Sequence, residues 1–230
     1  MLKKISKVID TVIDNNNTKD AHNIEIQLQR RALNQTAQFV EENMSQTKSF
    51  PDKFSLLKYS LNLTNKNGLF MEFGVYKGLT LNFIASNVDK TVYGFDSFEG
   101  LPENWRDGFE EGTFKLEGFP EVKENVKLVK GWFEDSLPNF ISQKTENCSF
   151  IHIDCDLYSS AKTIFKNLNN KIEKGTIIIF DEFFNYPGWK NGEYKAFMEF
   201  IQSNNIKFEY IGYCRYDEQV AVKILKKGEE

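Results

Sequence analysis

The sequence is poor in the residues and runs that mark several common classes of protein. Its three cysteines, Cys148, Cys155 and Cys214, are odd in number and lack C-x-x-C spacing, which predicts neither a disulfide framework nor a zinc site. No run approaches the about 18 apolar residues of a membrane helix. In the first segment, MLKKISKVIDTVIDNN, polar residues separate the apolar ones, so no signal-peptide core is formed. These absences favour a cytoplasmic protein without a membrane partner.

An excess of positive charge is missing as well. The 230 residues carry a formal net charge of −4, whereas binding to a phosphate backbone needs a basic face. A nucleic-acid partner is therefore not expected. With 40% hydrophobic and 27% charged residues, the chain has the composition of a soluble protein with an ample core, and no second globular domain is needed.

Residues 69–96, LFMEFGVYKGLTLNFIASNVDKTVYGFD, are the most informative stretch of the chain. An apolar run stops at Gly74 and Gly78, where a backbone without Cβ atoms turns sharply and lets a ligand approach closely. A helical pattern follows, and the next apolar run closes on Asp96. A carboxylate at this place accepts hydrogen bonds from the ribose hydroxyls of a nucleotide. The order of strand, glycine turn, helix, strand and acid predicts the first half of a nucleotide-binding α/β unit.

Past residue 67 the pattern alternates between strands and helices. Strands are expected near 69–74, 91–96, 126–130, 149–154 and 175–181, and helices near 78–87, 134–143, 157–170 and 192–203. Such alternation implies right-handed crossovers and a parallel sheet with helices on both faces. The last two strands, near 206–213 and 218–226, are joined by only about four residues and therefore form an antiparallel hairpin.

The N-terminal segment, residues 1–66, is more polar than the rest. Helical periodicity in Ile5–Val12 and again in Leu28–Val40 predicts two amphipathic helices, with a break at residues 15–18. The sequence Phe50-Pro51-Asp52 opens a third helix. Each of these helices has one apolar face to bury.

Two predicted strands deliver carboxylates at their C-terminal ends. The first reads IHIDCD and ends at Asp154, and the second reads IIIFDE and ends at Asp181 and Glu182. The spacing suits one helical crossover, so the two strands are expected to be neighbours about 4.8 Å apart. Carboxylates that converge there repel one another unless a hard cation such as Mg²⁺ compensates them. The alternative is that they are solvated strand ends or caps of the following helices.

Five motifs in order and spacing resemble the macrocin O-methyltransferase family, a branch of the class I S-adenosylmethionine-dependent methyltransferases. These motifs are MEFGVYKGLT, YGFDSFEGLP, VKGWFEDSLP, HIDCDLY and FDEFFNYPGW. The resemblance covers about residues 67–225. It implies a Rossmann-like α/β fold with a seven-stranded sheet, parallel except for the C-terminal hairpin, and a bound S-adenosylmethionine. It also implies a divalent metal, most simply Mg²⁺, that holds an acceptor hydroxyl, and it suggests sugars or glycosylated natural products as acceptors.

The resemblance also assigns residues to the site. The cofactor residues that it implies are Glu72, Gly74, Val75, Tyr76 and Thr80 near the methionine end, Asp96 at the ribose, and Ser97, Phe98, Gly131, Trp132 and Phe133 around the adenine. The metal ligands that it implies are Asp154, Asp181 and Glu182, although many relatives have Asp in place of Glu182. Residues 67–230 would form the cofactor-binding core. Residues 1–66 are then expected to shape the acceptor pocket or an oligomer interface.

The sequence offers two candidates for the general base. Related metal-dependent catechol methyltransferases place a lysine three residues after the first metal Asp, where this chain has Leu157. Asp154, at the ion and the sheet edge, is the first candidate for taking the proton. His152, two residues earlier on the same face of the strand, is the second. A histidine so deep in a strand is more often a satisfied core residue than a catalyst.

Two further segments are candidates for walls of the site. The long stretch between Phe98 and Val126 predicts either a lid over cofactor and acceptor or a plain surface excursion. Tyr186 and Trp189 follow the second pair of carboxylates and are expected either to stack on a sugar ring or to serve as packing.

Two other functions stay open at this point. Tyr158 and Lys162 match the Tyr-x-x-x-Lys pair of short-chain nicotinamide-dependent reductases, but the TGxxxGxG turn of those enzymes is missing. The other function is that of a non-catalytic protein that keeps Asp96 and binds the cofactor without turning it over.

Overall fold

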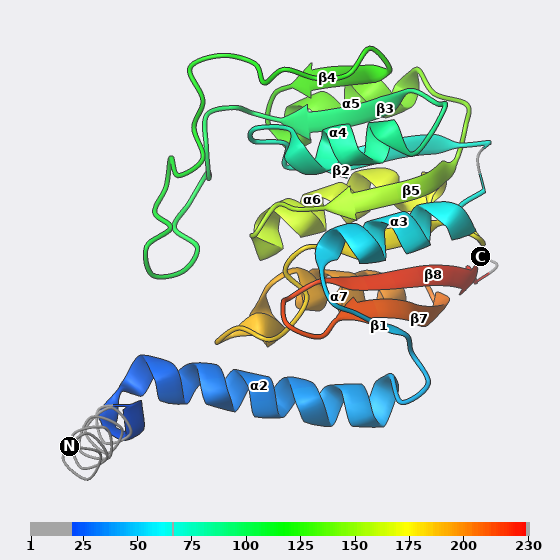
Figure 1. The fold of residues 1–230 in the computed structure, drawn as a ribbon. Coiled ribbons are helices and arrows are strands. Elements are labelled where there is room, and N and C mark those ends of the chain that lie inside the picture. Colours follow the sequence, from blue (N-terminus) through cyan, green and yellow to red (C-terminus); the bar gives the residue numbers. More distant parts are fainter. Residues whose placement is uncertain (1–19, 66, 229–230) are drawn as a thin grey trace, which may run out of the picture. The chain divides into compact units, whose positions relative to one another are not determined.

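The computed structural model describes residues 20–65 and 67–228, which form parts of two compact units (Figure 1). The first unit contains residues 20–45 and 185–188. The second contains the rest of the described chain. The helix predicted over Ile5–Val12 and the break at residues 15–18 lie outside the described residues.

The first unit is built on one long helix, α2 (Ile24–Asn43), which covers the predicted stretch Leu28–Val40. The Oδ1 atom of Asn23 caps its start by accepting hydrogen bonds from the first backbone N–H groups. Two hydrogen bonds attach the short segment 185–188 to this helix. The Asn185 N–H donates to Thr36 Oγ1 at 2.9 Å, and Gln29 Nε2 donates to the Asn185 carbonyl at 2.7 Å.

The second unit contains an eight-stranded sheet in the order β1-β7-β8-β6-β5-β2-β3-β4. Its strands are β1 (Ser49–Phe50), β2 (Leu69–Phe73), β3 (Val92–Asp96), β4 (Val126–Lys130), β5 (Cys148–Ile153), β6 (Ile177–Phe180), β7 (Lys207–Cys214) and β8 (Val220–Lys226). Neighbouring strands are parallel except where β8 pairs with β6 and β7. The predicted fold class and the antiparallel hairpin are confirmed. The eighth strand is β1, whose two residues pair with the end of β7 and are too short to show a periodic pattern.

Helices cover both faces of this sheet, as the alternating pattern predicted (Figure 1). They are α3 (Lys53–Leu63), α4 (Leu79–Ser86), α5 (Phe133–Ser142), α6 (Tyr158–Leu168) and α7 (Glu193–Ser203), with short 3₁₀ turns η1 (Asn169–Lys171) and η2 (Trp189–Asn191). Helix α3 packs beside α4, while α5, α6 and α7 contact one another in sequence order. Within the described part of the chain, no helix is both long and apolar enough to cross a membrane.

The core explains why the central strands are apolar throughout. Every residue of β2 and of β5 is buried, as expected for parallel strands that are covered on both faces. On one face Phe70 stacks on Phe150 with ring centroids 6.1 Å apart. On the other, Phe73 stacks on Phe95 at 4.8 Å and meets Phe133 of α5 edge to face. These contacts hold β2, β3 and β5 together in the middle of the sheet.

The carboxyl ends of the central strands meet at one edge of the sheet. The Asp154 N–H donates to the Phe73 carbonyl at 2.9 Å, and the Asp181 N–H donates to the Ile153 carbonyl at 2.8 Å. Gly74, which follows β2, has a φ of +89° and lies so close to the Asp154 carbonyl oxygen that a Cβ would overlap it. The glycine turn after β2 is therefore in direct contact with the strand that carries the first carboxylate.

This contact predicts unequal effects for two glycines of the same turn. Gly78 shares the left-handed conformation, with a φ of +74°, but an added Cβ would meet its nearest neighbours at an ordinary 3.6 Å. We expect Gly78→Ala to lower the free energy of unfolding by about 1–2 kcal/mol, the usual cost of that conformation. Gly74→Ala should cost about 3 kcal/mol or more, because overlap with the Asp154 carbonyl adds to the same cost. Urea denaturation of both variants measures the difference, and equal losses would contradict the close packing.

Candidate active site

The glycine turn after β2 is held in place by Asp96, the last residue of β3. Its Oδ2 atom accepts hydrogen bonds from the N–H groups of Val75 and Tyr76, both at 2.8 Å, and its Oδ1 atom accepts one from Phe98 at 2.7 Å. Tyr76 and Phe98 have positive φ angles of 46° and 58°, which non-glycine residues rarely adopt. Asp96 thus stabilises two strained loop conformations at the edge of the sheet.

These three hydrogen bonds limit how many more Asp96 can accept from a ligand. A carboxylate has about four lone-pair positions, two on each oxygen. Both positions of Oδ2 and one of Oδ1 are engaged by the backbone. One position on Oδ1 is not engaged by these backbone bonds, and Asp96 lines the cavity. The sequence predicted a ribose ligand for this carboxylate, and the structure adds a second role in shaping the turn.

A cavity of about 870 Å³ opens at this edge of the sheet. It lies outside the carboxyl ends of the strands, where open α/β sheets bind their ligands. The predicted site residues that line it are Gly74, Val75, Tyr76, Thr80, Asp96, Ser97, Gly131, Trp132, Phe133, Asp154, Asp181 and Glu182. Three other predicted residues do not line it. Glu72 and His152 are fully buried inside the sheet, and Phe98 is buried against Phe119.

Three carboxylates converge on the floor of the cavity. One oxygen each from Asp154, Asp156 and Glu182 lies within 4.8 Å of the other two. Asp156 belongs to the motif HIDCDLY, but no role was predicted for it. Its φ of +65° marks a sharp turn directly after β5, and its side chain is buried. The second aspartate of the motif was the signal that could have identified it.

The electrostatics of this cluster show an excess of negative charge. Burial, followed by repulsion from Asp181, raises the pKa values of Asp154 and Glu182 well above their ordinary range. Burial also raises the pKa of Asp156 to about 7, although Arg106 opposes the shift. Among the described side chains, the Oε2 atom of Glu182 is buried without a hydrogen-bond partner. Carboxylates in this state are suited to a cation that would compensate them.

Asp181 differs from the other three acids because it already has a cationic partner. Lys53, the first residue of α3, places its Nζ atom 3.1 Å from Oδ2 and 3.3 Å from Oδ1 of Asp181. His152 Nε2 lies 3.7 Å from the same Oδ1. Although burial opposes ionisation, His152 and Lys53 lower the pKa of Asp181 to about 2. Asp181 is therefore ionised and paired within the protein.

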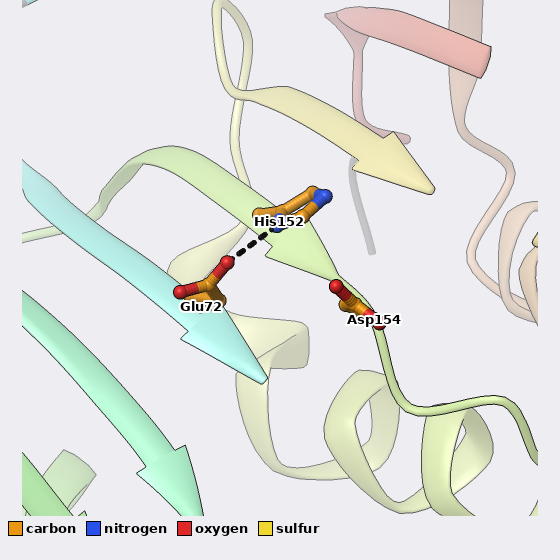
Figure 2. A group of neighbouring side chains, drawn as sticks. All are labelled: Glu72, His152 and Asp154. Atoms are coloured by element: carbon orange, nitrogen blue, oxygen red, sulfur yellow. Dashed lines mark hydrogen bonds and ion pairs between the residues drawn. The ribbon is translucent and has the colours of Figure 1, made fainter. Parts of the chain in front are cut away.

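His152 links two carboxylates inside the sheet. Figure 2 shows its ring directed toward Glu72, whose Oε1 atom lies 2.8 Å from Nδ1. Asp154, at the end of the same strand, belongs to this group, since one ligand atom from each of the three residues lies within 4.8 Å of the other two. Although burial opposes the charged form, Asp181 and Glu72 raise the pKa of His152 to about 10. A protonated imidazole has no lone pair for a metal or a substrate proton. Its Nδ1 atom is thus bonded to Glu72, whereas its Nε2 atom is buried without a hydrogen-bond partner among the described residues.

The long segment after Phe98 forms another wall of the cavity. Four partly exposed rings, Tyr76, Trp105, Phe109 and Phe114, contact one another in a row with centroids 5.1–5.6 Å apart, and we call them the aromatic wall. All four line the cavity. Arg106 lies over the Trp105 ring at 3.9 Å and pairs with Glu218 of the β7–β8 loop at 3.1 Å.

Trp189 and the Tyr158–Lys162 pair lie away from the cavity, although the sequence made both candidates for a functional role. Trp189, a candidate for stacking on a sugar, is only 1% exposed and packs against Tyr194 at 4.9 Å, so it belongs to the core. Tyr158 does bond to Lys162 at 2.9 Å, but its hydroxyl also donates to Glu199, and neither member of the pair lines the cavity. The predicted reductase alternative is therefore not supported.

Comparison with known proteins agrees with this geometry. Residues 71–183 match a family described as a methyltransferase domain. A calicheamicin methyltransferase of known structure superposes with a TM-score of 0.58 at 21% identity, over 74% of this chain and 76% of its own. The chain thus has the α/β fold of this methyltransferase of known structure, and residues 71–183 are similar to a methyltransferase domain.

Two curated relatives match this chain over only part of their own length. Demethyldecarbamoylnovobiocin O-methyltransferase of Streptomyces niveus is 28% identical over 57% of this chain and 60% of its own length. A Streptomyces olivaceus enzyme, 8-demethyl-8-(2,3-dimethoxy-alpha-L-rhamnosyl)-tetracenomycin-C 4'-O-methyltransferase, is 26% identical over 50% and 53% respectively. The chain therefore spans somewhat more than half the length of these relatives.

The contacts of Asp96 predict a loss of stability even without any ligand. Asp96→Ala removes a charged acceptor from three backbone N–H groups, which should lower the free energy of unfolding by about 1.5–3 kcal/mol. Urea denaturation of the ligand-free protein measures this. Cofactor affinity, measured by calorimetry, should fall as well. If the free energy of unfolding is unchanged, Asp96 has no role in stabilising the turn, and ligand binding is its only role.

Proposed function

We propose that the protein is an S-adenosylmethionine-dependent O-methyltransferase that uses a divalent cation and acts on a hydroxyl of a sugar or a glycosylated small molecule. One observation carries the proposal. The glycine turn held by Asp96 and the buried cluster of Asp154, Asp156 and Glu182 line the same cavity. A methyl donor and a hydroxyl acceptor can therefore meet between them.

The cofactor part of the proposal is supported by the glycine turn and by the methyltransferase domain over residues 71–183. At Gly74 the turn presents only backbone to the cavity, because glycine has no side chain. One acceptor position of Asp96 is not engaged by the backbone. Trp132 and Phe133 line the cavity beyond β4 and offer apolar surface to an adenine. Glu72 lies behind the turn and acts through His152 instead of facing the ligand.

The cation part is supported by the chemistry of the donor set. Carboxylate oxygens are the ligands that a hard divalent ion such as Mg²⁺ prefers. Asp154, Asp156 and Glu182 would hold it, since their oxygens converge and one of them is buried without a partner among the described residues. Asp181, which the resemblance placed among the ligands, would join them only after leaving Lys53. Such an ion lowers the pKa of a bound hydroxyl and so makes its oxygen more nucleophilic.

The remaining task of the protein is to align the acceptor and remove its proton. Several carboxylates line the cavity, and Asp154 stays the first candidate for taking the proton, with Asp156 beside it. His152 is protonated and enclosed, so we assign it a positioning role between Glu72 and Asp181.

The proposed acceptor class is supported by the aromatic wall, which lines the cavity together with the carboxylates. Aromatic faces beside hydroxyl-binding carboxylates are suited to a sugar or to a ring system that carries one. The names of the two Streptomyces relatives describe O-methyl transfer to natural products, and one of those names includes a rhamnosyl group. We therefore propose glycosides as the first acceptors to screen, and we retain the expectation that residues 1–66 contribute to the acceptor side or to a homo-oligomer contact.

The cation requirement gives the first test of this proposal. Methyl transfer from labelled S-adenosylmethionine to a panel of glycosides and sugar nucleotides should require Mg²⁺ and stop with a chelator. Asp154→Asn should lower turnover at least about 100-fold, because the group binds the ion and the acceptor region, while cofactor affinity stays within about twofold. Asp89→Asn, which alters an exposed acid elsewhere, is the control.

Two results would contradict parts of the proposal. Full turnover in chelator-treated enzyme would contradict the proposed requirement for a divalent cation. Tight cofactor binding without transfer to any acceptor, in the presence of Mg²⁺, would favour the non-catalytic alternative.

The aromatic wall gives a second test that concerns the acceptor alone. Phe109→Ala removes a central ring of the wall and should raise the acceptor KM about threefold to tenfold, the usual worth of an aromatic contact. The Kd of S-adenosylmethionine should not change. Phe119→Ala is a matched control, because Phe119 lies on the same segment, is 63% exposed and does not line the cavity. Equal effects of both variants on the acceptor KM would exclude the wall from recognition.

A further inference from the structure

Lys53 places a positive charge beside the carboxylate cluster. No sequence motif indicated this lysine. Its ammonium contacts both oxygens of Asp181, at 3.1 and 3.3 Å. The Asp181 side chain is 8% exposed and that of Lys53 29%, so the pair is shielded from water on the side of the acid. Lys53 also lines the cavity together with Asp154 and Glu182. The lysine therefore stands at the border of the proposed cation site.

The fold holds this lysine firmly at the site. Lys53 is the first residue of α3, directly after the N-cap Asp52, whose carboxylate accepts hydrogen bonds from Ser55 N and Ser55 Oγ at 2.9 and 2.7 Å. Helix α3 packs on β7, and β1, just before it, pairs with β7 as well. The start of α3 is thus anchored by a cap and by a strand on its N-terminal side.

This position is unfavourable for a lysine on local grounds. The first turn of a helix carries a partial positive charge and prefers acidic side chains, whereas α3 has no acid among its first residues. Although burial opposes the charged form, the facing carboxylates, above all Asp181, raise the pKa of Lys53 above its ordinary value. The ion pair with Asp181 therefore stabilises the positive charge of Lys53, which the start of a helix disfavours.

The pairing divides the acids at the edge of the sheet into two groups. Asp154, Asp156 and Glu182 converge on one point, and one oxygen of Glu182 is buried without a partner among the described residues. Asp181 is adjacent in sequence to Glu182 but is engaged by Lys53. A divalent ion at the convergence point would be attracted by the three convergent carboxylates and repelled by the ammonium.

We propose that Lys53 is an internal counter-cation that competes with the divalent ion for Asp181 and thereby weakens binding of that ion. The inference rests on the cation site of the proposed function and adds its regulation by a residue from the N-terminal segment. Lys53 is in this sense a positioning residue, because it acts through Asp181. Its removal would free both oxygens of Asp181 and take away one positive charge beside the site.

The proposal predicts a gain of affinity, which a merely structural defect would not produce. Titration of Mn²⁺ into the full chain, without cofactor or acceptor, is followed by the electron paramagnetic resonance signal of free Mn²⁺. Lys53→Met should bind Mn²⁺ roughly tenfold more tightly than the unmodified protein, because the freed carboxylate of Asp181 can join the ligands. Lys53→Arg, which keeps the charge, should bind as the unmodified protein does.

Two further variants make the result specific. Lys58→Met removes the same charge from an exposed position of the same helix and should leave the affinity unchanged. In an Asp181→Asn background, Lys53→Met should give a much smaller gain, because no carboxylate is freed. This pair of measurements also keeps the test open if the single variant at Lys53 folds poorly.

Each outcome decides the proposal. Tighter Mn²⁺ binding by Lys53→Met alone supports it, as does binding that appears only in this variant. Equal or weaker binding by Lys53→Met, or binding by neither protein, overturns it. Because no methyl transfer is measured, failure here leaves the transferase activity to be judged by the labelled-methyl assay with and without chelator.

Discussion

The rest of the site depends on the parallel register of β2, β5 and β6, which brings the carboxyl ends of these strands to one edge. The same register places the turn at Gly74 against the carbonyl of Asp154, so that the proposed cofactor side and the carboxylate side share a backbone contact. Cross-strand packing of Phe70, Phe73 and their partners in the core maintains the register.

Charge balance is the second constraint on this edge. Buried carboxylates are tolerated where they are paired or bonded, and here they are only partly so. Glu72 is bonded to His152, and Asp181 is paired with Lys53 and His152. Burial and repulsion from Asp181 raise the pKa values of Asp154 and Glu182, in keeping with the proposal that the convergent acids are the functional part of the cluster.

Much of the fold could be predicted because its signals are local. Buried parallel strands are continuous apolar runs, and the strands predicted near 69–74 and 149–154 agree with β2 and β5 to within one residue at each end. Strand β1 was not predicted, because a strand of two residues is too short to show a periodic hydrophobic pattern. Trp189 was a candidate for a sugar-binding wall, since an aromatic beside a Pro-Gly turn looks the same in sequence whether it faces a ligand or the core.

The sequence by itself determined which chemical groups end each strand, because the order of apolar runs, glycines and acids is written along the chain. Only the tertiary structure decided how those groups are paired. The partners Lys53 and Asp181 are 128 positions apart, and Asp156 joins Glu182 through a turn with a positive φ. Such contacts depend on helix packing and on burial, which sum many distant interactions, and no local pattern encodes them.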